Sequence, residues 1–457
     1  MLQSVRIAGY DRIPDLERLG PIQITNAEPE FAKAVRDAIE AHGGAASIVS
    51  APQRSGLCLF TEGLLENPPA ERHYQALQAA LLPDRNTHAI MLERASNDAI
   101  DQISGLSGLC RSIRIERPGT HIYALSFRSS QTNVEIASLI VSALSLPSDD
   151  YTLTEAGVYR DSPADEDVFP PLAPLRAPAS TVWLVTGGGR GVTADCTIEL
   201  AKRTGGSFIL LGRSEIVAWP SWLEPQSELK ALRGTLARNK NHPDVPNTPA
   251  EIDRFARKLL ASSEISSTLK AIEATGSNAK YVQADIGDKE SLRSVLAKQV
   301  SISGAITGLV HGAGVLSDGL ADRLDLKSFE TVFAPKVIGL QTILSCLDLQ
   351  ALHHVGLFSS ASAVFGNEGQ ANYAAANAWL NNVAVQLAAE LPNTQVKSFC
   401  WGPWHGGMVD DALARMFTER GIGLISRQEG ARIFADQLLH SVHDQVRFVI
   451  GDEWGSA

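Results

Sequence analysis

The feature that most constrains this chain is an apolar strand that runs straight into a glycine-rich turn. Residues Thr181–Thr186 form a near-continuous apolar run, which is typical of a buried parallel strand. The turn that follows reads Gly187-Gly-Gly-Arg-Gly-Val-Thr-Ala, and a helical stretch continues from it through Lys202. A second strand is predicted at Ser207–Gly212, about 25 residues after the first. This order predicts the opening unit of a doubly wound α/β sheet.

The rest of the C-terminal part repeats the alternation. Helical stretches separate most of the further apolar runs, as a parallel sheet with helical crossovers requires. The further strands are predicted at Ala279–Ala284, Ala305–His311, Val355–Ser360, Val396–Trp401 and Val446–Ile450. We therefore predict a doubly wound parallel sheet over 181–457.

One crossover in this sheet is too long. About 65 residues separate Arg213 from the strand at Ala279, where a crossover usually needs far fewer. Thr248-Pro-Ala-Glu251 is a capping box with proline at the first helical position. Apolar residues then recur at helical spacing at Ile252, Phe255 and Leu259. We predict an inserted helical hairpin at about 215–265 on the surface, which packs on its own domain or contacts a partner.

The N-terminal segment, residues 1–160, has a plainer α/β pattern. Strands are predicted at 45–50, 56–60, 88–92 and 121–127, and helices at 28–42 and 133–144. They suggest a parallel sheet, but no glycine-rich turn follows any of these strands. We interpret the segment as structural and its polar residues as solvated surface. The stretch 161–180 holds five prolines and a cluster of acids, which predicts an extended linker between two domains.

Charge and cysteine content exclude several classes of protein. The net charge of −11 makes the chain a poor candidate for binding nucleic acid or anionic lipid. The five cysteines are scattered without a CxxC pair, which argues against disulfides or a zinc site and fits a reducing cytoplasm; we expect no metal. The N-terminus does not resemble a signal peptide, and no run approaches the roughly 18 apolar residues of a membrane span.

The glycine turn predicts a dinucleotide site, although similar loops that bind nothing are common. Its backbone can approach a pyrophosphate, and the following helix offers free N–H donors; Gly187 and Gly191 would allow the tight turn. An NAD site needs an acid after the second strand, where this chain has Arg213 and Ser214. Arg190 adds a cation inside the turn. These residues suit a 2′-phosphate, so NADPH is the predicted cofactor.

Four polar residues form a candidate catalytic set. Ser360 ends a predicted strand, and Tyr373 begins an alanine-rich helix, with Asn377 one turn later on the same face. A phenol can protonate an alkoxide if its pKa is lowered, and a nearby ammonium such as Lys336 would lower it. Singly, each residue is equally compatible with a surface or capping role.

Together, these residues resemble the ketoreductase domains of polyketide and polyunsaturated fatty acid synthases, a branch of the short-chain dehydrogenase/reductases. Those domains carry Lys, Ser, Tyr and Asn at a set spacing, with the lysine upstream and Asn four residues after Tyr. Lys336 and Ser360 lie 37 and 13 residues before Tyr373, and Asn377 matches the last position. Ser359 and Ser362 are near neighbours, and spacing alone selects Ser360.

Further matches to this family extend over 180–455. His311-Gly-Ala-Gly resembles its cofactor-edge motif, Asp285-Ile286 its adenine contact, and Trp401-Gly-Pro-Trp its nicotinamide-side segment. The resemblance implies that residues 1–160 are a truncated Rossmann-like half without a cofactor site. Thr193 departs from the family, which commonly has a third glycine there. The glycine turn and the insertion after Arg213 look most like those of ketoreductases from polyunsaturated fatty acid and enediyne-type synthases. The predicted cofactor-binding residues are Thr186, Gly187, Gly188, Gly189, Arg190, Gly191, Val192, Arg213, Ser214, Asp285, Ile286, His311, Gly312, Ala313, Gly314, Lys336, Tyr373 and Pro403.

The resemblance also implies a reaction. NADPH would reduce the β-carbonyl of an acyl chain held on an acyl carrier protein by phosphopantetheine, among other synthase domains. Tyr373 would protonate the alkoxide, Ser360 would bind the carbonyl oxygen, Lys336 would lower the tyrosine pKa and hold ribose, and Asn377 would orient the lysine or a water. Leu316 and Asp318 fit the family's marker for the D-hydroxy product, and Phe365 replaces the tryptophan of the opposite class.

Two other functions stay open at this point. One is a free-standing reductase of a small or CoA-linked ketone. The other is a catalytically silent scaffold that binds NADPH, although the intact set of four residues argues against it.

Overall fold

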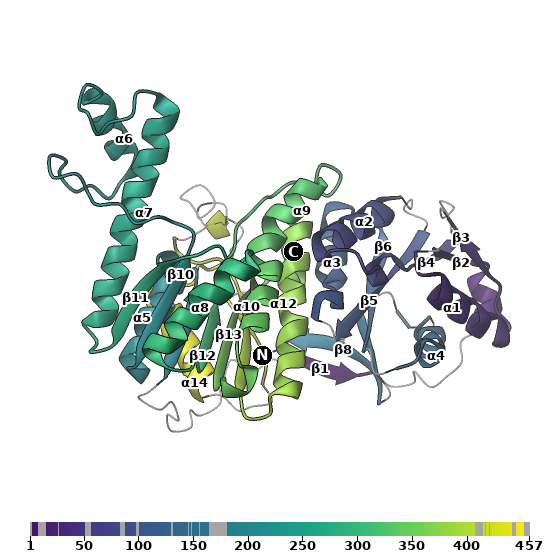
Figure 1. Ribbon diagram of the computed structural model, residues 1–457. Coiled ribbons are helices and arrows are strands. Elements are labelled where there is room, and N and C mark those ends of the chain that lie inside the picture. Colours follow the sequence, from purple (N-terminus) through teal and green to yellow (C-terminus); the bar gives the residue numbers. More distant parts are fainter. Residues whose placement is uncertain are drawn as a thin grey trace.

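The computed structural model describes two packed α/β units, each built on its own sheet (Figure 1). The residues it describes are 2–7, 15–25, 27–50, 56–82, 87–96, 100–128, 131–144, 146–147, 149–154, 156–163, 181–406, 415, 417–419, 421–440 and 445–451. We call 2–163 the first unit and 181–451 the second unit. Of the predicted linker, 161–163 end a strand, and the remainder lies outside the described residues.

The first unit contains an eight-stranded sheet in the order β3-β2-β4-β5-β6-β7-β8-β1. Its strands are β1 Leu2–Arg6, β2 Ile22–Thr25, β3 Ala46–Val49, β4 Gly56–Phe60, β5 Thr87–Ser96, β6 His121–Arg128, β7 Tyr151–Thr154 and β8 Gly157–Pro163. Its helices are α1 Pro29–Ala41, α2 Pro69–Leu81, α3 Leu106–Glu116 and α4 Asn133–Ala143. The six strands from β2 to β7 are parallel, as predicted. At one edge, which the sequence did not predict, β8 turns back on β7 and pairs antiparallel with β1.

The second unit has a seven-stranded, wholly parallel sheet in the order β11-β10-β9-β12-β13-β14-β15. Its strands are β9 Val182–Thr186, β10 Ser207–Gly212, β11 Asn278–Gln283, β12 Gly308–His311, β13 His354–Ser360, β14 Gln395–Trp401 and β15 Arg447–Ile450. Its helices are α5 Gly191–Thr204, α6 Leu229–Arg238, α7 Pro249–Glu273, α8 Lys289–Ser303, α9 Leu326–Phe333, α10 Gly339–Cys346, α11 Ser362–Phe365, α12 Ala371–Glu390 and α14 Arg427–His440. The strand order reverses between β9 and β12, which confirms the doubly wound fold and leaves a crevice at their carboxyl ends.

The predicted insertion is ordered as an arm, which we define as residues 215–265. It contains α6 and the first part of α7 and extends away from both sheets in Figure 1. The capping box is confirmed, since Thr248 and Glu251 exchange their side-chain-to-backbone hydrogen bonds. Apolar side chains give the arm a small core of its own, made of Leu223, Leu232, Leu236, Val245, Ile252, Ala256 and Leu259. The helix α7 then continues to Glu273 and packs on α5, so the arm is an extension of the crossover helix.

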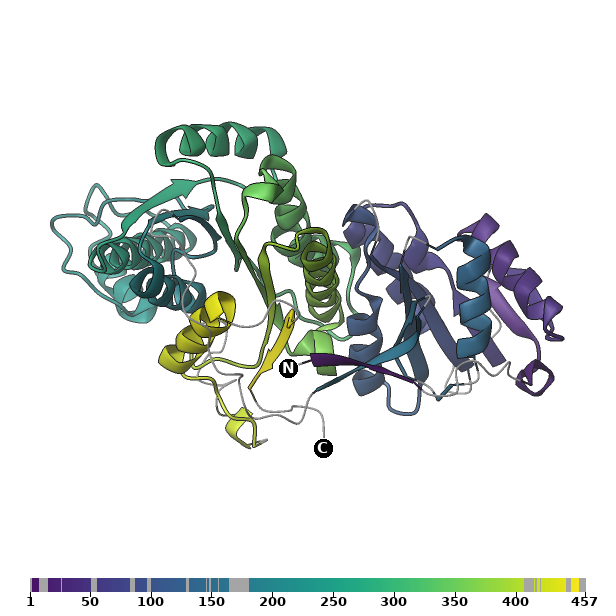
Figure 2. The ribbon, with the colours of Figure 1, turned by 90° about the horizontal axis from the view of Figure 1, so that it is seen from below.

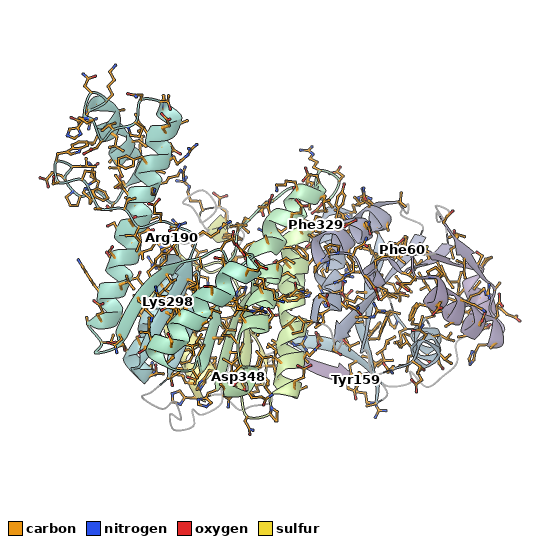
Figure 3. All side chains as sticks on the ribbon, in the orientation of Figure 1. Phe60, Tyr159, Arg190, Lys298, Phe329 and Asp348 are labelled. Atoms are coloured by element: carbon orange, nitrogen blue, oxygen red, sulfur yellow. The ribbon has the colours of Figure 1, made fainter. Side chains whose placement is uncertain are left out.

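The two units meet along α12, which packs against α3 of the first unit (Figures 1 and 2). Gly105 and Gly108 allow this close approach, because a side chain on either would overlap backbone atoms of α12. Contacts between α9 and α2 extend the interface, and Phe329 lies there in Figure 3. α12 is buried on nearly every side, which explains its apolar and alanine-rich sequence.

No helix in the described ranges combines the length and apolar character that crossing a lipid bilayer requires. All five cysteines are free thiols, as their scattered positions predicted, and Cys346 is the least buried of them.

Candidate functional site

A single large cavity connects the glycine turn to the candidate catalytic residues. It has a volume of about 2030 Å³ and follows the carboxyl ends of the strands in the second unit. Ligand pockets typically measure about 300–1,000 Å³, so this cavity has room for a dinucleotide and a second substrate together. Its position at the reversal of strand order is where doubly wound sheets bind ligands.

The glycine turn is shaped for close approach of a ligand backbone. Gly187 and Gly191 have φ values of +73° and +65°, which favour glycine. A β-carbon on Gly187 would lie 2.9 Å from the Gly312 carbonyl carbon, so the turn packs directly on the second predicted glycine motif. Thr193, the departure from the family pattern, packs where Gly312 has no side chain, at 2.5 Å from the position of a β-carbon. The turn opens α5, and its first residues Gly191, Val192 and Thr193 line the cavity, where the free N–H groups of a helix start could bind an anion.

Two arginines line the cavity beside the glycine turn. Arg213 and Ser214 follow β10 directly and line the cavity with Arg190. Arg190 is 58% exposed and lies 3.9 Å from Glu264 of α7, beside the base of the arm (Figure 3). Thr268 of the same helix donates a hydrogen bond to the Gly189 carbonyl at 3.0 Å. The long crossover helix therefore supports the glycine turn at this end of the cavity.

Lys336 enters the cavity from a π-helical turn over Ala334–Ile338. Such turns occur frequently at functional sites, and Pro335 beside the lysine removes one backbone donor. The Lys336 side chain is only 3% exposed, and its Nζ donates to the Phe358 carbonyl at 2.9 Å. Gly314 leaves it room, since a β-carbon there would lie 2.9 Å from the lysine Cε.

Hydrogen bonds distinguish Ser360 from its neighbours. Its Oγ accepts from the N–H and the hydroxyl of Ser362, at 3.1 and 3.0 Å. Since a hydroxyl has two acceptor positions and one donor, the O–H of Ser360 remains available to a ligand in the cavity. The Ser359 hydroxyl instead donates to the Asn377 carbonyl at 3.1 Å. The geometry therefore favours Ser360, the residue that spacing selected.

Tyr373 and Asn377 share one face of α12, as their spacing predicted. The Asn377 amide donates to the Tyr373 carbonyl at 2.8 Å, one turn back along the helix. Among the described residues, the Asn377 amide therefore bonds to the backbone of its own helix and not to Lys336. Its Oδ1 is buried without a partner among the described residues. Lys336 Nζ lies 5.2 Å from the centroid of the Tyr373 ring.

The sequence predicted a charged Lys336 that lowers the pKa of Tyr373. In the structure the pKa of Tyr373 is raised and that of Lys336 is lowered. Burial raises the pKa of Tyr373 to about 12, the Asn377 side chain lowers it, and the charge of Asp318 raises it. Burial lowers the pKa of Lys336 from 10.5 to about 7. The lysine is therefore only partly charged near neutral pH, and the phenol stays protonated. A protonated phenol remains able to transfer its proton to an alkoxide, which is a far stronger base.

The buried lysine makes a prediction about stability. Between about pH 7 and pH 10.5 the unfolded chain carries the Lys336 proton and the folded chain does not, so the free energy of unfolding rises with pH across this window. Below it, the full cost of burying the charge is present. We expect Lys336→Met to raise the free energy of unfolding by about 2–4 kcal/mol near pH 6, and by less than about 1 kcal/mol near pH 10.

Urea unfolding at the two pH values measures this difference. Lys327→Met, which replaces a lysine with a 79% exposed side chain on α9, is the matched control and should change stability equally little at both. A gain for Lys336→Met that is the same at both pH values would show that its charge is not the cause.

Most of the predicted site residues line this one cavity. They are Thr186, Gly187, Gly189, Arg190, Gly191, Val192, Arg213, Ser214, Asp285, Ile286, Gly312, Ala313, Gly314, Leu316, Asp318, Lys336, Ser360, Tyr373 and Pro403. Gly188, His311, Phe365 and Asn377 are not among its lining residues. His311 is buried behind the turn, where its ring nitrogens bond to the Thr186 hydroxyl and the Lys336 carbonyl at 2.9 and 3.1 Å. Burial, with the charge of Lys336, lowers the pKa of His311 to about 3, so this neutral ring ties the glycine turn to the lysine segment.

Sequence reasoning missed the contribution of the first unit. The prediction that its polar residues are solvated surface is wrong for α3, because Arg111 bonds to α11 of the second unit, and Ser112 and Glu116 bond to its loops. Ile115 of the same helix lines the cavity. These partners lie more than 200 residues away in sequence, so no local pattern could have indicated them.

Comparison with known proteins gives a consistent result. The KR domain family matches residues 181–406. A polyunsaturated fatty acid synthase protein from Thraustochytrium is 30% identical over 352 residues, which are 74% of this chain and 12% of that protein. Polyketide synthase PksL of Bacillus subtilis is 26% identical over 333 residues, or 71% of this chain and 6% of that protein. The chain thus spans only a small part of these curated relatives.

Solved structures share the fold over nearly the whole chain. A ketoreductase domain from the bacillaene assembly line has a TM-score of 0.66 at 19% identity, covering 98% of this chain and 96% of that one. An A1-type ketoreductase has a TM-score of 0.69 at 21% identity, covering 99% and 92%. At these identities the likeness establishes the fold alone.

Proposed function

This chain is a ketoreductase domain of the polyketide-synthase type, within the short-chain dehydrogenase/reductases, and from that premise we propose that it reduces the β-keto group of an acyl thioester with NADPH. The proposed substrate is held on an acyl carrier protein by phosphopantetheine, and the proposed product is the D-3-hydroxyacyl thioester. The pathway is polyketide or fatty acid synthesis, alongside other synthase domains, in a reducing cytoplasm.

One observation supports this function most strongly. The side chains of Lys336, Ser360 and Tyr373 open into the same cavity as the glycine turn, although they come from three different elements. Of these, Ser360 has a hydroxyl hydrogen with no acceptor among the described residues, and Tyr373 is protonated near neutral pH. A carbonyl that becomes an alkoxide needs such donors, aimed at one oxygen.

The residues at the other end of the cavity suit the cofactor. The turn at Gly187 and Gly191 and the start of α5 would hold its pyrophosphate, and Arg190, Arg213 and Ser214 its 2′-phosphate. When bound, NADPH supplies the hydride that reaches the β-carbon. Asp285 and Ile286 line the cavity after β11 and would contact the adenine, and Pro403 would lie at the nicotinamide end.

The protein's part in the reaction is proton transfer and orientation. In our proposal Ser360 donates a hydrogen bond to the carbonyl oxygen, and Tyr373 transfers its phenolic proton to that oxygen as the carbon is reduced. Lys336 binds the ribose and, when charged, favours the phenolate that remains. Asn377, whose Oδ1 has no partner among the described residues, accepts a hydrogen bond from a relay water that reprotonates the site.

The domain division belongs to the same proposal. We assign residues 1–160 to a structural, truncated Rossmann-like subdomain, 161–180 to a linker and 181–457 to the catalytic subdomain, with the arm as an insertion. Leu316 and Asp318 lie on the cavity wall and are proposed to direct the stereochemistry, together with Phe365.

The experiment is an NADPH-oxidation assay with a panel of β-ketoacyl thioesters on carrier protein, CoA and a small thiol. We expect turnover with NADPH to exceed that with NADH by at least about tenfold, carrier-bound substrates to react best, and the D alcohol to predominate. Equal rates on the CoA and small-thiol substrates would instead favour a free-standing reductase. Cofactor binding without NADPH oxidation on any of the substrates would indicate a silent scaffold, and an L alcohol would reject the stereochemical assignment.

A further inference from the structure

The last turn of α3 belongs to the first unit but reaches the substrate end of the cavity. Glu116, the final residue of this helix, accepts hydrogen bonds from the N–H groups of Ala321 and Gly369, at 2.6 and 2.9 Å. These N–H groups belong to two different loops, one just after Asp318 and the other shortly before Tyr373. One carboxylate therefore bridges two loops of the other unit.

The two loops are also bonded to each other. The Gly319 N–H donates to the Gly369 carbonyl at 2.8 Å, and the Gln370 amide donates to the Asp318 carboxylate at 2.9 Å. Both loops line the cavity next to Tyr373. Because Glu116 fixes both of them to α3, its position sets the distance between the walls at this end of the cavity.

The neighbouring residue, Ile115, offers an apolar surface in the same place. Its side chain is 40% exposed, and that of Leu320, in one of the bridged loops, is 37% exposed. Both are among the few large apolar residues so exposed in the described ranges, and both line this cavity. Phe417 and Ile422 also line it. Exposed apolar surface gathered in a cavity favours an apolar ligand over a polar one.

We propose that the last turn of α3 is part of the substrate site, with Ile115 contacting the acyl chain beyond the β-carbon and Glu116 acting as a positioning residue for the loops 316–321 and 366–370. This inference rests on the proposed function, whose substrate it specifies further as a thioester with an extended apolar chain. The first unit then selects substrates as well as supporting the second unit.

The first test replaces Ile115 with serine and measures kcat/KM on β-ketoacyl thioesters of about four to ten carbons. We expect the preference for the longer chains to fall about fivefold to tenfold, while the dissociation constant for NADPH and the melting temperature stay unchanged. Ile302→Ser, on α8, replaces an isoleucine that is 65% exposed and outside the lining of the cavity; it should leave the preference unaltered. An Ile115→Ser enzyme with the wild-type chain-length preference would overturn the contact.

The second test replaces Glu116 with glutamine, which keeps the shape but puts an amide beside one of the two N–H donors. We expect KM to rise about tenfold and the ratio of the two product enantiomers to fall several-fold, with Glu40→Gln, an exposed glutamate on α1, as the control. A purely structural role would lower the melting temperature and kcat without changing that ratio or KM, and this outcome would overturn the positioning role.

The two proposals can fail separately. If the wild type reduces none of the thioesters, the proposed function fails. The inference is then decided by calorimetric binding of the β-hydroxyacyl thioesters, which Ile115→Ser should weaken more for long chains than for short ones. Equal weakening at every length would overturn it.

Discussion

Tyr373→Phe is expected to lower kcat by about 10²- to 10⁴-fold while NADPH still binds with nearly wild-type affinity. The substitution removes one oxygen atom and keeps the aromatic ring of residue 373 on α12, so the fold and the walls of the cavity are unchanged. The proton that the phenol supplies has no equally placed substitute, because Ser360 donates a hydrogen bond but is a much weaker acid. Steady-state rates and fluorescence titration of NADPH measure the two effects.

Tyr159→Phe provides the matched control for this variant. Tyr159 lies on β8 of the first unit and is not among the lining residues of the cavity; Figure 3 shows it well apart from Arg190, which does line it. Its loss of a phenol should leave kcat within about twofold. If Tyr373→Phe retained more than about a tenth of the wild-type kcat, the tyrosine would not be the proton donor, and the proposed mechanism would have to be abandoned.

Gly108→Ala is expected to destabilise the protein by about 2–4 kcal/mol, although alanine is the better helix former by about 1 kcal/mol. Gly108 lies on α3 where it meets α12, and an added methyl group would overlap the Ala374 carbonyl oxygen and lie 2.6 Å from its carbon. Backbone atoms cannot rotate away as a side chain does, so the two helices must separate. Since α12 carries Tyr373, we also expect kcat to fall at least about tenfold.

Gly234→Ala is the comparison that isolates the close contact. Gly234 is also helical, in α6 of the arm, but a β-carbon there meets only the end of the Arg238 side chain, at 3.4 Å. This variant should be neutral or more stable by up to about 1 kcal/mol. Urea unfolding gives the free energy of unfolding of both variants, and steady-state assays give kcat. Equal changes in Gly108→Ala and Gly234→Ala would show that the α3–α12 contact is not tight.

Local sequence patterns predicted much of the second unit because its elements are self-contained. The apolar run at Thr181–Thr186 forms β9, which begins one residue later, at Val182. In the turn after it, Gly187 and Gly191 adopt the positive φ values that favour glycine. The capping box at Thr248 formed as predicted. The carboxyl ends of parallel strands meet at one edge of a sheet, which is why residues at the ends of β9, β10 and β13 line one cavity.

The first unit was predicted less completely. The edge strand β1 has few apolar residues and is paired through β8, about 155 residues later, so its identity depends on a long-range partner. The strand β2 was also missed, although β3, of the same length, was predicted. The helix α2 did have a local signal, since prolines precede Ala-Glu at its start, and it was overlooked.

The sequence by itself determined the class of fold, the family and the candidate set of Lys336, Ser360 and Tyr373, because those depend on residue types at fixed spacings along one stretch of chain. Only the tertiary structure decided how that set is surrounded. Burial, and not a neighbouring charge, dominates the pKa values of Lys336 and Tyr373. The walls beside them include α3 of the other unit, since Glu116 and Ile115 acquire their neighbours only when segments more than 200 residues apart pack together.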